Sequence, residues 1–221
     1  MIKTIIFDMD GVIVDTEPVH KYAYYKLFNE LGILVSPEMY ASFTGNSTRN
    51  VFQKLKAHFV LEQEVEDLIL RKRFFFNDAF DTKEDLELIA GVKALIVDLH
   101  QNDVQLILAS SASKGTIHRV FNRFELYPYF THIVSGEDFP KSKPDPAIFL
   151  HAASLSKAPK EQCAIIEDST SGVRAACAAD IFCIAYHSEN SKMQDLTGAE
   201  YFVKDFKDVD AAVIKQVRQV K

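Results

Sequence analysis

The stretch IIFDMDGVIVD, residues 5–15, begins as an apolar strand and then places three aspartates around a glycine. The aspartates are Asp8, Asp10 and Asp15, and the glycine is Gly11. Carboxylates are poor strand formers and are costly to bury without partners. Acids at the end of an apolar strand therefore predict a chemical site at that point, where a purely structural strand would carry none.

The composition is that of an ordinary globular protein. Hydrophobic residues make up 48% of the 221 residues, charged residues 25%, and the net charge is −6. This charge does not favour nucleic acid or an anionic membrane as a partner. We expect no leader peptide and no membrane span, because acids interrupt the first apolar run and no later run reaches the required length of about 18 residues. The three cysteines, Cys163, Cys177 and Cys183, form no close pair, which is typical of free thiols in a cytoplasmic protein.

Short apolar runs alternate with helical patterns from residue 91 onward. Strands buried on both faces and separated by helices are typical of a parallel sheet. We therefore predict an α/β fold, a Rossmann-like doubly wound parallel sheet. The expected strands are 3–8, 104–110, 132–136, 163–168 and 182–186, and the expected helices are 91–102, 114–125, 145–156, 170–180 and 206–220.

Residues 17–80 show apolar residues at helical spacing and no strand of note. Glu17 and Pro18 suit the first turn of a helix, and Gly32 suits its end. These residues predict an all-helical cap inserted after the first strand. The predicted division is a core of residues 1–15 and 86–221 and a cap of residues 16–85, with the return hinge near 81–90.

The carboxyl ends of several predicted strands carry polar residues that suit one reaction. Ligands of open parallel sheets bind beyond these ends. If the ends converge, the site contains Asp8, Asp10, Ser110, Lys143 and the pair Glu167-Asp168. So many carboxylates require a cation, and their oxygen atoms suit Mg²⁺. Asp8 could then attack phosphorus, with Asp10 moving the proton and Lys143 and Ser110 binding the phosphoryl oxygens.

Four motifs, in this order, resemble the haloacid dehalogenase-like hydrolase superfamily. They are DMDGVIVDT (8–16), ASS (109–111), SKPDP (142–146) and IIEDSTSG (165–172). The resemblance implies that Asp8 is the nucleophile, Asp10 the general acid and base, Ser110 the phosphate-binding hydroxyl and Lys143 the motif lysine. It also implies that Mg²⁺ binds to Asp8, the backbone carbonyl of Asp10, and Glu167 with Asp168. The helical insert looks like the cap of the β-phosphoglucomutase-like subfamily.

Each core residue also has a structural alternative. An aspartate before glycine often marks a turn, and Ser110 could be an ordinary residue at a strand end. Lys141 competes with Lys143, although the SKP context favours Lys143. Asp168 could cap the helix that starts near Ser169, but capping leaves Glu167 unexplained. The order of the motifs favours the catalytic interpretation.

The cap residues are open to two interpretations. Thr16 and His20 lie at the start of the first cap helix, where Thr16 with Asp15 could cap the helix and His20 could be a surface residue. The stretch TGNSTRN (44–50) resembles a substrate-specificity loop. In the β-phosphoglucomutase pattern a lysine stands where this chain has Thr44. The candidate substrate-binding residues are Thr16, His20, Gly45, Asn46, Arg49, Arg73 and, as a backbone donor, Ser111; solvated arginines are the alternative for Arg49 and Arg73.

These observations predict a Mg²⁺-dependent phosphatase that acts on a small phosphate monoester, a sugar or polyol phosphate, through an aspartyl phosphate. A hexose-phosphate mutase such as β-phosphoglucomutase is the alternative, weakened by the absence of a lysine at position 44. A 2-haloacid dehalogenase needs no Mg²⁺, which the acidic set argues against, and a non-catalytic sensing module needs no nucleophile. We expect a monomer, with an oligomer left open.

Overall fold

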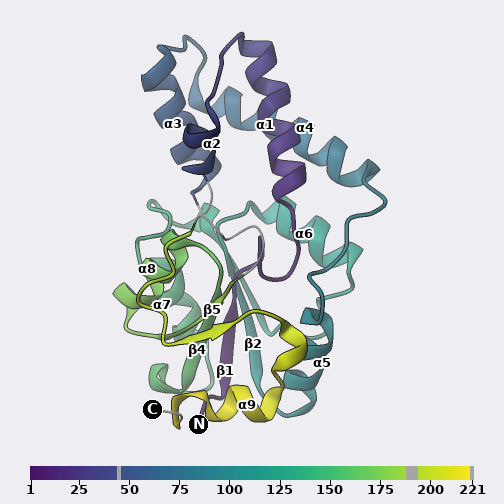
Figure 1. The fold of residues 1–221 in the computed structure, drawn as a ribbon, viewed down its shortest axis with the longest axis vertical. Coiled ribbons are helices and arrows are strands. Elements are labelled where there is room, and N and C mark those ends of the chain that lie inside the picture. Colours follow the sequence, from purple (N-terminus) through teal and green to yellow (C-terminus); the bar gives the residue numbers. More distant parts are fainter. Residues whose placement is uncertain (44–45, 188–193, 220–221) are drawn as a thin grey trace.

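The computed structural model describes residues 1–43, 46–187 and 194–219, and its centre is a six-stranded parallel sheet (Figure 1). The strand order is β3-β2-β1-β4-β5-β6, so the chain runs outward from β1 first on one side and then on the other. The strands are β1 (Thr4–Phe7), β2 (Gln105–Ser110), β3 (His132–Ser135), β4 (Cys163–Glu167), β5 (Phe182–Tyr186) and β6 (Tyr201–Val203). This order confirms the predicted doubly wound sheet and puts the reversal of strand order between β1 and β4.

Successive strand residues point into two separate apolar layers, which explains why the strands are apolar throughout. In β1, Ile5 and Phe7 belong to one hydrophobic cluster and Ile6 to the other. The first layer is covered by α5 (Val92–Gln101), α6 (Lys114–Arg123) and α9 (Ala211–Gln216), and the second by α7 (Ala147–Ser154) and α8 (Thr170–Ala179). Burial on both faces is the property from which a parallel sheet was predicted.

Two details of the C-terminal region differ from the prediction. The strand β6 was missed, because only Val203 of its three residues is buried and three residues give no readable pattern. A single helix over 206–220 was wrong: the structure has a 3₁₀ turn, Phe206–Asp208, then α9 and a second 3₁₀ turn, Val217–Gln219. Asp210 interrupts the helix because its backbone is extended and its side chain accepts a hydrogen bond from the backbone N–H of Val213 (2.8 Å), which caps α9.

Four helices follow β1 and lie beyond the carboxyl ends of the strands, at the opposite end of the molecule from both termini (Figure 1). They are α1 (Glu17–Leu31), α2 (Pro37–Ala41), α3 (Thr48–Phe59) and α4 (Val65–Thr82). Helix α1 ends at Gly32, as predicted, where φ is +66°. No helix in the described ranges is both long and apolar enough to cross a membrane.

The two chain segments that join these helices to the sheet lie side by side. Val14 forms an antiparallel bridge with Leu88, and the Ile89 N–H donates to the Ile13 carbonyl at 2.9 Å. From α6, the Arg123 guanidinium donates to the carbonyls of residues 80, 83, 84 and 86. These contacts agree with a hinge near 81–90, and the domain boundaries themselves stay a prediction.

Candidate active site

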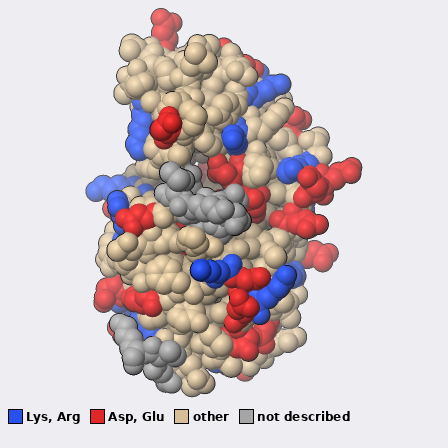
Figure 2. Space-filling model, in the orientation of Figure 1, with Lys and Arg blue, Asp and Glu red and all other residues tan. Residues whose placement is uncertain are grey.

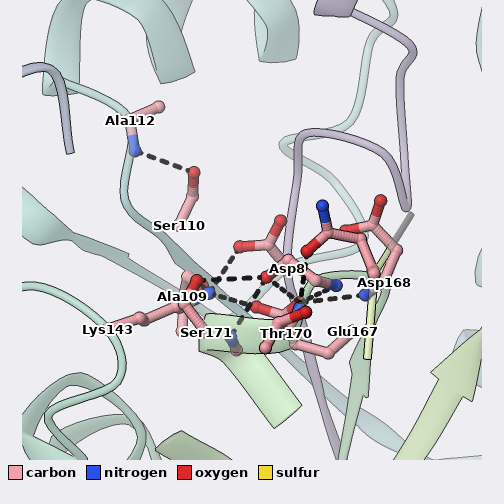
Figure 3. A network of polar contacts seen from close by, with 12 residues as sticks. Asp8, Ala109, Ser110, Ala112, Lys143, Glu167, Asp168, Thr170 and Ser171 are labelled. Carbon is pink, nitrogen blue, oxygen red and sulfur yellow. Dashed lines mark hydrogen bonds and ion pairs between the residues drawn. The ribbon is translucent and has the colours of Figure 1, made fainter. Parts of the chain in front are cut away.

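Three carboxylates and a lysine meet where β1 and β4 end, beside the reversal of strand order (Figure 3). The Lys143 Nζ lies 2.6 Å from Asp8 Oδ1 and 2.7 Å from Glu167 Oε1, and it donates to the Ala109 carbonyl at 3.2 Å. Asp168 completes the group, with ligand atoms of Asp8, Glu167 and Asp168 within 4.8 Å of one another. The predicted convergence of distant strand ends is therefore present, and Lys143 rather than Lys141 reaches it.

The Glu167 carboxylate is fixed by hydrogen bonds to both oxygens. One oxygen accepts from Lys143, and the other accepts from the backbone N–H groups of Asp168 (2.9 Å) and Ser169 (3.0 Å) and from the Ser169 hydroxyl (3.0 Å). A Cβ at Gly172 would lie 1.8 Å from Glu167 Oε1, so the carboxylate can occupy this place only beside a glycine. The helix cap of α8 is Ser169, which removes the alternative that Asp168 serves as the cap.

The Asp168 carboxylate lies against the turn that follows β1. At Gly11 φ is +85°, which favours glycine, and a Cβ there would lie 2.1 Å from Asp168 Oδ2. Gly11 thus has two functions. It turns the chain between Asp10 and Val12, and it leaves room for Asp168, which lies more than 150 residues later in the sequence. The glycine in the DMDG motif is explained by this close approach.

The charges and donor atoms of the group are compatible with a bound cation. Burial raises the pKa of Asp8 to about 7, with Glu167 and Asp10 adding to the effect and Lys143 opposing it. Burial and the same neighbouring acids raise the pKa of Asp168 well above its usual range. Burial alone would lower the pKa of Lys143, but the charges of Asp8 and Glu167 outweigh the effect of burial and raise that pKa. One lysine against three buried carboxylates leaves excess negative charge, and the oxygen donors fit Mg²⁺.

The loop after β2 presents backbone and hydroxyl groups next to this cluster. Ser110 is fully buried, and its hydroxyl accepts the backbone N–H of Ala112 at 3.0 Å (Figure 3). Ser111 lines the neighbouring cavity, whereas Ser110 does not. Ser113 caps α6 by accepting the Thr116 N–H. The structure therefore puts Ser110 in the turn that shapes the loop, and its role toward a phosphoryl group stays a prediction.

On the side of the helical insert, Asp10 faces Thr16 and His20. The Thr16 hydroxyl donates to Asp10 Oδ1, and His20 Nε2 lies 3.8 Å from the same oxygen. Thr16 occupies the N-cap position of α1, but its side chain makes no capping hydrogen bond, so the expected cap by Thr16 was wrong. The Asp15 side chain does bond the first turn, because its Oδ1 accepts the backbone N–H of Glu17 at 3.3 Å. Burial alone would raise the pKa of Asp10, but the nearby His20 and the hydrogen bond from Thr16 outweigh the effect of burial and lower that pKa.

The sequence analysis missed Lys72, on α4. Its Nζ lies 2.6 Å from His20 Nδ1 and over the rings of Tyr24 (4.6 Å) and Phe76 (5.0 Å), and only 3% of the residue is exposed. Burial lowers the pKa of Lys72 from 10.5 to about 7, although Asp10 and Glu17 favour the charged form. A sequence signal existed: Leu68, Lys72 and Phe76 recur at the four-residue spacing of one buried helix face.

A cavity of about 520 Å³ separates the carboxylate cluster from α1–α4 and is lined by residues of both parts. The predicted cap residues Arg49 and Arg73 line it, but each is ion-paired: Arg49 with Glu66 (2.5 Å) and Arg73 with Glu137 (2.8 Å). Asn46 lines it too, and its amide donates to the carbonyl of Ser42 (3.0 Å). Gly45, with Thr44, lies outside the described residues.

A second pair of polar residues in the cavity wall was not predicted. The Tyr40 hydroxyl donates to Glu17 Oε1 at 2.9 Å, and burial raises the pKa of Glu17. On the face shown in Figure 2, acidic and basic side chains are interspersed over the upper and lower parts of the molecule.

The chain is similar to enzymes that act on phosphorylated compounds. The β-phosphoglucomutase of Bacillus subtilis is 26% identical over 219 residues, which cover 97% of this chain and 94% of that protein. A phosphorylated carbohydrates phosphatase of Thermotoga maritima is 28% identical over 179 residues, covering 81% and 82%. The crystal structure of a β-phosphoglucomutase from Clostridium difficile is 26% identical, with a TM-score of 0.84 and coverage of 98% and 96%.

The family model described as haloacid dehalogenase-like hydrolase matches residues 5–186, which contain every strand end discussed above. The relatives that match this chain include phosphatases and a mutase, and these relatives support an enzyme of phosphoryl transfer in general terms. On this match, the chain belongs to the haloacid dehalogenase-like hydrolases.

Proposed function

We propose that this protein is a Mg²⁺-dependent phosphatase that hydrolyses a sugar or polyol monophosphate through an aspartyl phosphate on Asp8. The observation that carries the proposal is the position of Asp8. It is buried at the end of β1, fixed by Lys143, clustered with Glu167 and Asp168, and open to the 520 Å³ cavity. A carboxylate so placed is a nucleophile for phosphorus.

The residues of the cluster fit a bound Mg²⁺, as their charge and donor atoms indicate. Asp8, Asp168 and the backbone carbonyl of Asp10 would hold the ion, while Glu167, whose oxygens are already hydrogen-bonded, would position Lys143. Bound Mg²⁺ would neutralise charge on the phosphoryl oxygens.

The side chains would divide the reaction as follows. Asp8 attacks phosphorus, and Lys143 offsets the charge of the phosphoryl oxygens. Asp10 donates a proton to the leaving oxygen and afterwards accepts one from the water that attacks the aspartyl phosphate. The contacts of Asp10 to Thr16 and His20 would keep its carboxyl on the side of the cavity where the leaving group lies.

The make-up of the cavity wall favours a phosphatase over a mutase. A mutase must bind the second phosphate of a bisphosphate, for which Arg49 was the candidate. Arg49 is paired with Glu66 and is largely exposed. The Glu17–Tyr40 pair adds an acid and a hydroxyl to the cavity wall, which suits hydroxyl groups of a sugar or polyol better than a second anion.

The test is phosphate release from a panel of phosphate monoesters, with and without Mg²⁺. We expect release from sugar or polyol phosphates, loss on chelation with EDTA and recovery with Mg²⁺. Asp8→Asn should abolish release, and Asp78→Asn, at an exposed position on α4, should leave it unchanged. Conversion of β-glucose 1-phosphate into glucose 6-phosphate without phosphate release would identify a mutase, and tight binding without turnover would identify a sensing module.

The proton transfer has its own test. Asp10→Asn should slow hydrolysis of alkyl phosphates, whose leaving groups need protonation, by about 10²–10⁴-fold. Activated aryl phosphates should lose much less, because their leaving groups depart as anions. Equal losses on both substrate types would remove Asp10 as the general acid.

A further inference from the structure

One polar contact from α3 and one from α4 join the helical insert to the sheet domain across the cavity. Arg73 Nη2 on α4 lies 2.8 Å from Glu137 Oε1, and Asn50 Nδ2 on α3 donates to the Ser142 hydroxyl at 2.6 Å. All four side chains line the cavity that contains the carboxylate cluster. The Arg73–Glu137 pair is more than one third exposed on both sides, so it is the kind of contact that can break and reform.

Glu137 connects Arg73 to the loop after β2. Its second oxygen accepts the backbone N–H of Lys114 (2.9 Å), the first residue of α6. The same segment also packs on that loop: the Ser135 hydroxyl donates to the Ala112 carbonyl (2.7 Å), and a Cβ at Gly136 would lie 3.0 Å from the backbone of Ser111. A change in the position of Glu137 is therefore expected to shift the loop of residues 110–114.

Ser142 connects Asn50 to the lysine of the cluster. Ser142 directly precedes Lys143, whose ammonium group donates hydrogen bonds to Asp8, Glu167 and the Ala109 carbonyl. A hydrogen bond to Ser142 therefore lies one residue from the group that orients the nucleophile. The two contacts thus reach both parts of the domain expected to bind the phosphoryl oxygens.

We infer that Arg73 and Asn50 are positioning residues, which act through Glu137 and Ser142 to set the 110–114 loop and Lys143 when α1–α4 are seated on the sheet. The inference rests on the proposed function for its kinetic consequence. It reassigns Arg73, expected from the sequence to bind substrate, to a contact within the protein. Phosphoryl transfer is then fast only with both contacts made, which links seating of the cap to chemistry.

The kinetic test compares Arg73→Gln, Glu137→Gln and the double variant. Each single variant should lower kcat about 10-fold with KM nearly unchanged, and the double variant should lose no more than either single, since both break one contact. The loss should be the same with acetyl phosphate, which has no sugar or polyol group for Arg73 to bind. A rise in KM confined to larger substrates would overturn the inference and return Arg73 to substrate binding. Asn50→Ala and Ser142→Ala should behave as a second such pair.

Arg71→Gln is the matched control. Arg71 lies on the same helix and makes a comparable pair, with Glu30 at 2.6 and 2.9 Å, but both partners belong to α1 and α4. It should leave kcat unchanged. A loss equal to that of Arg73→Gln would mean that any weakening of the helices slows the enzyme, and would contradict the specific coupling.

A second measurement does not depend on turnover and separates this inference from the proposed function. Amide hydrogen exchange of residues 110–114 should be about 10-fold faster in Arg73→Gln than in the wild type or Arg71→Gln, because local opening becomes easier. Unchanged exchange would overturn the coupling even in an active enzyme. Absence of phosphate release by the wild type, with the exchange effect present, would instead count against the proposed function alone.

Discussion

Replacing Lys72 with methionine should make the protein more stable near neutral pH while reducing its activity. Methionine has a similar length and can pack against the Tyr24 and Phe76 rings that now lie beside the ammonium group. The pKa of Lys72 falls from 10.5 to about 7 in the folded protein, mainly because the side chain is buried. Burying the charged Lys72 ammonium therefore lowers the free energy of unfolding, and replacing Lys72 with methionine removes this cost.

The size and sign of the effect follow from the two pKa values. The interval between 10.5 and about 7 corresponds to a cost of at most about 5 kcal/mol, at ~1.4 kcal/mol per pH unit. The unfolded chain binds more protons between these values, so the cost is complete below pH 7 and is relieved as pH rises toward 10.5. Losing the hydrogen bond to His20 reduces the stability gain of the variant by about 1 kcal/mol, and screening by solvent reduces the cost of the buried charge further. We expect a net gain of about 2 kcal/mol at pH 6.5 that nearly vanishes at pH 9.5.

Urea unfolding at the two pH values measures this gain. Circular dichroism is the suitable signal because the chain has no tryptophan. Lys54→Met, at an exposed position on α3, is the control and should change stability by less than about 0.5 kcal/mol. The same Lys72 variant should lose about 10–100-fold in kcat, since it removes a cation beside His20 and Asp10. A variant that is less stable than the wild type at pH 6.5 would refute the reasoning, because it would mean that Asp10 and Glu17 more than repay the burial of the charge.

Two further predictions test contacts that hold the site and the hinge. Gly172→Ala should displace Glu167, which lies 1.8 Å from the added Cβ, and should lower kcat at least about 100-fold. The control is Gly115→Ala, where the added methyl meets nothing closer than 4.0 Å; it should retain activity and gain up to about 1 kcal/mol in urea unfolding. Full activity in Gly172→Ala would show that Glu167 can shift without consequence. Arg123→Met should cost about 2 kcal/mol, because one carbonyl of α4 and three carbonyls of the hinge lose their donor. Arg119→Met, which breaks an exposed pair with Asp81, should cost less than about 0.5 kcal/mol. Equal costs in the two variants would show that Arg123 does not hold the hinge.

Much of the core could be predicted because its signals are local. Each predicted strand up to residue 186 is present, since apolar runs bounded by helices identify strands of a parallel sheet. Once the strands are parallel, their carboxyl ends must lie at one edge, so Asp8 and Glu167 could be brought together without coordinates. The C-terminal region was harder because β6 has three residues and the helical pattern of 206–220 hides the break at Asp210.

The cap residues could not be assigned from the sequence for a physical reason. The sequence pattern around a charged helix residue often does not show whether its side chain faces a cavity, an ion-pair partner or water. Arg73 was chosen and its neighbour Lys72 was not: the spacing of Lys72 marked a buried helix face, but its contacts with His20 and Tyr24 come from another helix and depend on how α1 and α4 pack. The exposed pairing of Arg49 with Glu66 likewise depends on how α3 and α4 pack.

The sequence by itself determined β1 to β5, the helical insert and the residues that end β1, β2 and β4, because apolar runs and glycine turns act over a few neighbouring residues. Only the tertiary structure decided which charges neutralise one another. The Lys143 ammonium reaches Asp8 across 135 residues of chain, Gly11 makes room for Asp168, and Glu137 pairs with Arg73. Charge compensation depends on distances of a few ångströms between segments far apart in the chain, and these are set by packing. The aspartates that end IIFDMDGVIVD were therefore legible in the sequence, while the cations that oppose them were only partly so.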